Sequence, residues 1–173
     1  MNDNKALHYF ISHKNDENSD QVYEELYWID VKYKLTKKAP SVKDKLILVD
    51  LFNKTIILLK NCVPNRDDIH KEIEGKIDLT IIKQLIENDI KDDELFFDLI
   101  QYILQKLSQF QARANDQENA IWMNKLKTSL MNNVYYQNFI PQFFQQLFDK
   151  LKQIIDDSNN FKNFLSKNGI KKI

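Results

Sequence analysis

The scarcity of glycine constrains this chain more than any other feature. Only Gly75 and Gly169 occur among 173 residues, where average usage would give about a dozen. Glycine permits positive φ angles at tight turns and lets the backbone approach a phosphate closely. Two glycines are too few for the phosphate-binding loops of nucleotide-binding folds or for a series of tight β-hairpins. The sequence therefore favours helices joined by short loops.

Apolar residues recur at helical spacing along most of the chain, and prolines, capping residues and the two glycines divide it. We expect Ser41 to cap a helix with Asp44 three residues later, Gly75 to end one, and Pro141 to lie in the first turn of another. The expected apolar stripes are Val22, Leu26, Ile29 and Tyr33; Leu46, Val49, Phe52, Ile56 and Leu59; Leu79, Ile82 and Ile86; Leu95, Phe96, Leu99, Ile100, Ile103, Leu104 and Leu107; Ile121, Trp122, Leu126 and Leu130; and Ile140, Phe144, Leu147, Leu151 and Ile154.

These patterns predict an all-α fold, an irregular bundle of six to eight helices in a single domain over residues 19–173, with a central helix over 95–107. Residues 1–18 are polar and are expected to form a flexible arm. A separate short helix is expected over 158–168. The stripe over 140–154 is interpreted as core packing, with a partner helix as the alternative, and we expect Phe144 and Leu147 to be buried.

The charge balance argues against a strongly basic nucleic-acid binder. Lysine and arginine together number 25 and so do the acidic residues, which gives a formal net charge of zero. Only Arg66 and Arg113 are arginines, whereas arginine is the bidentate reader of phosphate and guanine. Specific base recognition is therefore poorly supported.

Catalytic and metal-binding patterns are weak. Cys62 is the single cysteine, so no disulfide can form within the chain, and nothing in the sequence marks it as an activated nucleophile. Asp67 and His70 could share one helical face, but a helical metal site needs further inward carboxylates. We therefore expect no enzyme activity, no catalytic residue, no cofactor and no metal site.

Two groups of residues are candidates for partner contacts. Basic residues lie beside Tyr27, Trp28 and Tyr33, a pattern that can follow a nucleic-acid backbone, although lysines at a helix end also form ordinary solvated faces. Aromatic residues near the middle of the chain could anchor a protein interface or pack in the core. The candidates are Lys32, Lys34, Lys37 and Lys38 in the first group and Trp122, Tyr135 and Tyr136 in the second.

Residues 40–116 resemble the T-complex protein eleven family. The resemblance rests on Pro64 and Arg66 after a long apolar helix, on residues 73–84 continuing to Glu87, and on residues 102–116. The family usually has a glycine where this chain has Asp89. What the resemblance implies is a helical, non-enzymatic regulatory role linked to flagellar function and cyclic-AMP signalling.

Together these observations predict a helical adaptor or regulatory subunit that docks other proteins within a larger assembly. The alternative is a nucleic-acid-binding accessory subunit of a multi-protein complex. The polar residues 1–20 and the lack of a long uncharged run predict a soluble, intracellular protein without membrane contact, in the cytoplasm, a cilium or the nucleus. The sequence does not identify the partner.

Overall fold

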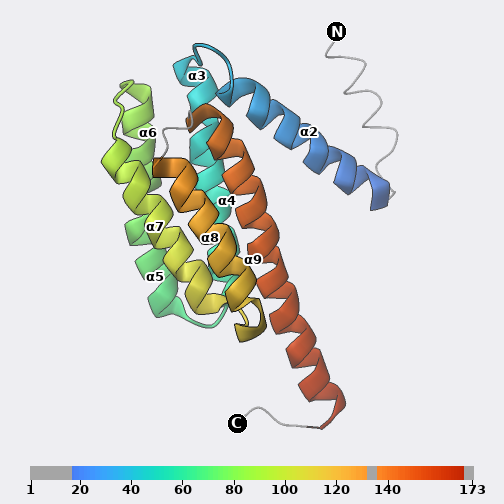
Figure 1. The fold of residues 1–173 in the computed structure, drawn as a ribbon. Helices are drawn as coiled ribbons and strands as arrows, with labels where there is room; N and C mark the ends of the chain where they lie inside the picture. Colours follow the sequence, from blue (N-terminus) through green and yellow to red (C-terminus); the bar gives the residue numbers. More distant parts are fainter. Residues whose placement is uncertain (1–16, 132–135, 170–173) are drawn as a thin grey trace.

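The computed structural model describes residues 17–131 and 136–169, and over these residues it contains helices and no strand. The all-α prediction is therefore confirmed. Of the predicted arm, residues 1–16 lie outside the described part, while residues 17 and 18 already belong to the first described helix. The elements, labelled as in Figure 1, are α2 (Glu17–Leu35), α3 (Val42–Lys45), α4 (Ile47–Cys62), α5 (Asp67–Lys76), α6 (Leu79–Glu87), α7 (Asp93–Phe110), the 3₁₀ turn η1 (Arg113–Asn115), α8 (Asp116–Met131) and α9 (Tyr136–Lys167).

Short polar side chains start several of these helices. Ser41 and Asp44 form a reciprocal capping box at α3, where the Asp44 N–H donates to Ser41 Oγ over 3.1 Å and the Ser41 N–H donates to Asp44 Oδ2 over 3.0 Å. Asp78 caps α6, and Asp92 caps α7 by accepting the Leu95 N–H over 2.9 Å. Such caps satisfy backbone donors that have no partner within the helix.

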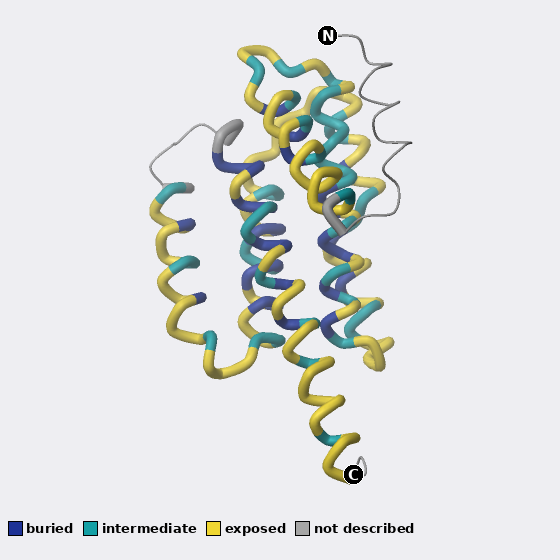
Figure 2. Tube along the Cα trace, turned by 90° about the vertical axis from the view of Figure 1, so that its right-hand side faces the viewer, coloured by how far each residue is buried: buried dark blue, intermediate teal, exposed yellow. Residues whose placement is uncertain are grey.

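The core is centred on α9 rather than on α7. Helix α9 runs along the bundle beside α4, and α7 lies to one side with α5 (Figure 1). Of the described helices, α9 contributes the largest group of buried apolar side chains, and the buried segments face the interior in Figure 2. Phe144 and Leu147 are fully buried, which confirms the core interpretation for the stripe over 140–154.

Aromatic rings connect the helices across this core. The Phe144 ring centroid lies 5.3 Å from that of Phe52 on α4 and 6.0 Å from that of Phe148 on its own helix. Phe148 in turn packs on Trp28 of α2 at 5.6 Å, and Phe52 packs on Phe96 of α7 at 6.3 Å. Three of these four ring pairs are edge-to-face and the Trp28–Phe148 pair is tilted. Ring pairs stabilise a core beyond their apolar area, so these rings help to hold α2, α4, α7 and α9 together.

The carboxyl-terminal region differs from the prediction of two helices. Helix α9 is continuous over 32 residues, begins before Pro141 and carries that proline in its second turn. Proline there removes one backbone hydrogen bond but does not end the helix. Ser158 does not start a new helix.

The two glycines have different positions relative to the helices. Gly75 lies within α5 rather than ending it. Gly169 follows α9 with a φ of 67°, a conformation that glycine adopts most easily.

Helix α2 buries a different face from the predicted one. Its inner side chains are Trp28, Val31 and Leu35, which pack against the bundle. The predicted stripe points the other way and is exposed, from 37 % for Val22 to 65 % for Tyr33. The helix therefore has two apolar faces on opposite sides, because the two sets differ by about half a turn of the helix.

Candidate docking cleft

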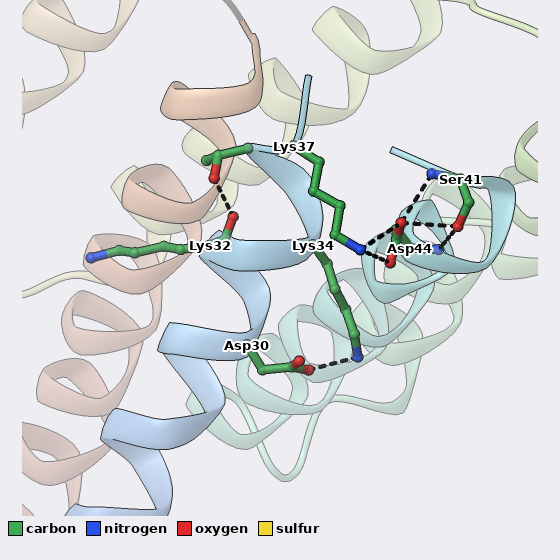
Figure 3. Close-up of polar contacts among 7 residues, drawn as sticks. Asp30, Lys32, Lys34, Lys37, Ser41 and Asp44 are labelled. Atoms are coloured by element: carbon green, nitrogen blue, oxygen red, sulfur yellow. Dashed lines mark hydrogen bonds and ion pairs between the residues drawn. The ribbon is translucent and has the colours of Figure 1, made fainter. Parts of the chain in front are cut away.

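Two of the four candidate lysines form ion pairs within the chain (Figure 3). The Lys34 Nζ lies 2.6 Å from Asp30 Oδ2, and the Lys37 Nζ lies 3.1 Å from Asp44 Oδ1. Backbone capping first, and Lys37 second, lower the pKa of Asp44 to about 2, so this carboxylate stays charged beside the lysine. These ion pairs reduce the charge that Lys34 and Lys37 can offer to a phosphate.

Lys32 and Lys38 are exposed, and neither ammonium forms an ion pair within the described residues. Of the three rings beside these lysines, Tyr33 is exposed, and Lys37 Nζ lies 4.6 Å from its ring centroid. Trp28 is buried, and the Tyr27 hydroxyl donates to Asp50 Oδ2 over 2.8 Å; burial and this contact raise the pKa of Tyr27. The structure therefore brings Lys37 and Tyr33 together, whereas Tyr27 and Trp28 pack against the bundle.

Trp122 uses both its ring and its N–H within the domain. The ring stacks on Phe143 at 6.2 Å between centroids, the Nε1–H donates to Gln146 Oε1 over 2.6 Å, and Lys150 Nζ lies 5.0 Å from the centroid. These contacts attach α8 to α9. Tyr135 lies outside the described residues, and Tyr136 is the first residue of α9, with a side chain that is not described.

Cys62 is buried in the bundle, and His70 contacts backbone carbonyls. Cys62 is buried, and burial raises the pKa of its thiol to about 12, the opposite of what a reactive thiolate requires. The His70 Nε2 lies 2.8 Å from the Val63 carbonyl and 3.2 Å from the Lys60 carbonyl, at the carboxyl end of α4. Within the described residues no cluster of metal-binding side chains occurs.

An apolar cleft of about 520 Å³ is the feature that sequence reasoning missed. It opens where the carboxyl end of α2 meets α3, α4, α6 and the first turns of α7 and α9. Its floor is buried and its walls are half-buried, whereas Ile90 at its edge is 55 % exposed. The floor consists of Leu35, Phe52, Ile82, Leu99 and Ile140, and the walls include Leu48, Leu85, Ile86, Leu95 and Phe96.

Charged residues of both signs surround the opening of the cleft. Lys45 Nζ lies 2.6 Å from Asp89 Oδ1, which joins α3 to the turn after α6. Lys91 Nζ lies 3.5 Å from Asp93 Oδ2, and the Asp92 carboxylate caps α7. Among the described lining residues there is no serine, cysteine or histidine. The arrangement suits binding of an apolar group with polar flanks, rather than nucleophilic chemistry.

The turn after α6 fixes the edge of the cleft. Asp89 has a φ of 53°, while the Ile90 N–H donates to the Leu85 carbonyl over 2.8 Å and the Asp89 N–H donates to the Ile86 carbonyl over 3.0 Å. This bond pattern ends a helix with one left-handed residue, which is usually glycine. The backbone at Asp89 therefore has a conformation that glycine adopts more easily than aspartate does.

Comparisons of the chain with protein families, with curated proteins and with solved structures each returned no match. The resemblance of residues 40–116 therefore stays a prediction. Over the part of the chain that the structure describes, none of the helices combines the length and apolar content needed to cross a bilayer.

Proposed function

We propose that this chain is a non-enzymatic helical adaptor or regulatory subunit that holds an apolar segment of a partner protein in the cleft beside α6. The observation that carries the proposal is the cleft itself, which leaves the half-buried side chains of Leu85, Ile86 and Leu95 open to a ligand. Covering apolar surface contributes roughly 25 cal/mol for each Å² removed from water. A protein segment that fills the cleft would gain this contribution.

The charged residues at the opening of the cleft favour binding of a peptide over binding of a purely apolar small molecule. Two ion pairs, Lys45 with Asp89 and Lys91 with Asp93, line the opening. Flanking side chains of a peptide can pair with charges of either sign, whereas a hydrocarbon cannot. Partner choice would then depend on the flanks and affinity on the apolar anchors.

The charge surroundings of the lysine segment favour a protein partner over nucleic acid. Lys34 and Lys37 are paired with carboxylates, so phosphate binding would compete with existing contacts. On the resemblance of residues 40–116, we extend the proposal to an assembly in a flagellum or cilium, or in cyclic-AMP signalling.

Affinity capture with matched variants tests the proposal. Ile86→Asp places a charge in the cleft wall, and Ile81→Asp places the same charge on the same helix at a residue that is already 47 % exposed and lies outside the cleft. We expect a protein retained by the wild type and by Ile81→Asp to be lost from Ile86→Asp. The purified pair should then show the same difference by calorimetry, with circular dichroism confirming that both variants fold. If every captured protein binds all three forms equally, the cleft is not the docking site.

A further inference from the structure

The outer face of α2 is an apolar seam that the bundle does not cover. Helix α2 lies at the edge of the bundle in Figure 1, and its inner face packs against the other helices. The outer residues are 37–65 % exposed although all four are apolar or aromatic. This outer seam consists of Val22, Leu26, Ile29 and Tyr33.

The spacing of the outer seam is that of a two-stranded coiled coil. Its residues are separated by four, three and four positions, so they alternate between the two core positions of a heptad repeat. The helix is 19 residues long, or about 28 Å, which is enough for four layers of side chains. A seam of this length needs a partner helix of similar length and the same spacing.

We propose that the outer seam binds the same seam of a second copy of this chain, with the two α2 helices antiparallel. In the register that matches core positions, Leu26 packs on the partner's Ile29, and Val22 packs on the partner's Tyr33. The two-fold symmetry repeats each contact, so four layers form. This register also fixes which charged side chains meet at the edges of the seam.

Charge complementarity selects the antiparallel direction. Glu25 and Lys32 flank the seam on the same side, and in this register each lies opposite the other in the second copy, which gives two ion pairs. In a parallel pair, Glu25 would instead lie beside the partner's Asp30, a like charge, and Lys32 would have no opposite residue because α2 ends at Leu35. Only the antiparallel arrangement gives both residues an opposite charge.

Both residues of the proposed pair are available. Within the described residues, the Lys32 ammonium has no ion pair, and its side chain points away from Asp30 and Lys34 in Figure 3. Glu25 is exposed and accepts one long hydrogen bond of 3.4 Å from Gln21. Ion pairing across the dimer would therefore not break a salt bridge formed within one chain.

A charge swap measured by sedimentation equilibrium tests the proposal. Lys32→Glu places like charges opposite each other at both ends of the seam, so we expect the dimer dissociation constant to rise about tenfold or more. Glu25→Lys combined with Lys32→Glu restores opposite charges in the antiparallel register, and the constant should return to near the wild-type value. Added salt should weaken the wild-type dimer.

Substitutions of exposed apolar residues by aspartate provide a second test. Ile29→Asp should abolish dimers, whereas Ile121→Asp, at a residue on α8 that is 51 % exposed, should leave them unchanged. A wild-type chain that stays monomeric up to about 1 mM overturns the proposal. So does a dimer that is unaffected by Lys32→Glu, or one that the double charge swap fails to restore. None of these outcomes tests the proposed docking in the cleft, because Leu35, at the carboxyl end of α2, is the one described residue of that helix that lines it.

Discussion

Replacing Phe144 by alanine should be among the most damaging changes that the core can receive. The Phe144 side chain is fully buried, and its ring lies 5.1 Å from Phe143, 5.3 Å from Phe52 and 6.0 Å from Phe148, measured between centroids. Removal of a buried phenylalanine ring typically costs about 3–5 kcal/mol, because apolar contact is lost and a cavity remains. Loss of three ring pairs places the expected cost toward the upper end of that range.

Urea unfolding followed by circular dichroism measures this cost. The midpoint should fall while the dependence of the unfolding free energy on urea stays unchanged, and the melting temperature should drop by roughly 6–20 °C for a chain of this size. Phe144→Leu should cost about 1–2 kcal/mol, because most of the apolar volume remains.

Phe161→Ala is the matched control, since Phe161 lies on the same helix and is 62 % exposed. It should change the unfolding free energy by about 0.5 kcal/mol or less. A loss below about 1.5 kcal/mol for Phe144→Ala, or equal losses for Phe144→Ala and Phe161→Ala, would refute the packing argument.

Three further predictions concern the Cys62 thiol, the Asp44 carboxylate and the candidate lysines. The Cys62 thiol, with its pKa raised to about 12, should react with a disulfide reagent at pH 8 far more slowly in the native than in the unfolded protein; equal rates would contradict its burial. The pKa of Asp44 is lowered from 3.8 to about 2, so its contribution to stability should be complete above about pH 4 and be lost as the pH falls toward 2; unfolding of Asp44→Asn should lack that part of the pH dependence. Wild-type binding to nucleic acid should be non-specific, with a Kd of about 10⁻⁴ to 10⁻⁶ M at physiological salt; submicromolar binding that Lys34→Glu, Lys37→Glu and Lys38→Glu together abolish would instead favour the nucleic-acid alternative.

A local signal in the sequence correctly predicted the start of α3, whereas α9 begins before Pro141 and continues through Ser158. Ser41 and Asp44 form the expected capping box at α3. A cap depends on side-chain and backbone atoms that are within a few residues of each other. The rest of the fold is not required to fix it, and so a single sequence contains the necessary information.

The sequence does not determine which face of α2 packs against the bundle. Both Leu26 with Ile29 and Trp28 with Val31 follow helical spacing, so periodicity identifies the helix but not the face that packs. The choice depends on the surface that α4 and α9 present, where Phe148 receives Trp28. For the same reason, periodicity alone does not distinguish the outer seam from the face that packs on the bundle.

Local sequence patterns do not predict the cleft either, for a related reason. Phe52, Ile86 and Phe96 each look like core residues within their own helices. They border an opening because the ends of several helices meet there without filling the space. Only the relative placement of those helices distinguishes an open wall from a filled core, and loop lengths alone do not determine that placement.

The length of α9 gives the molecule an uneven distribution of stability. At 32 residues the helix extends over about 48 Å, and none of its described residues beyond 155 is buried (Figure 2). That end has little but its own backbone hydrogen bonds to hold it, so it should fray on a microsecond timescale while the segment around Leu147 opens only when the whole domain unfolds. Amide hydrogens along this one helix should therefore exchange over several orders of magnitude in rate, with the steepest change near Ile155.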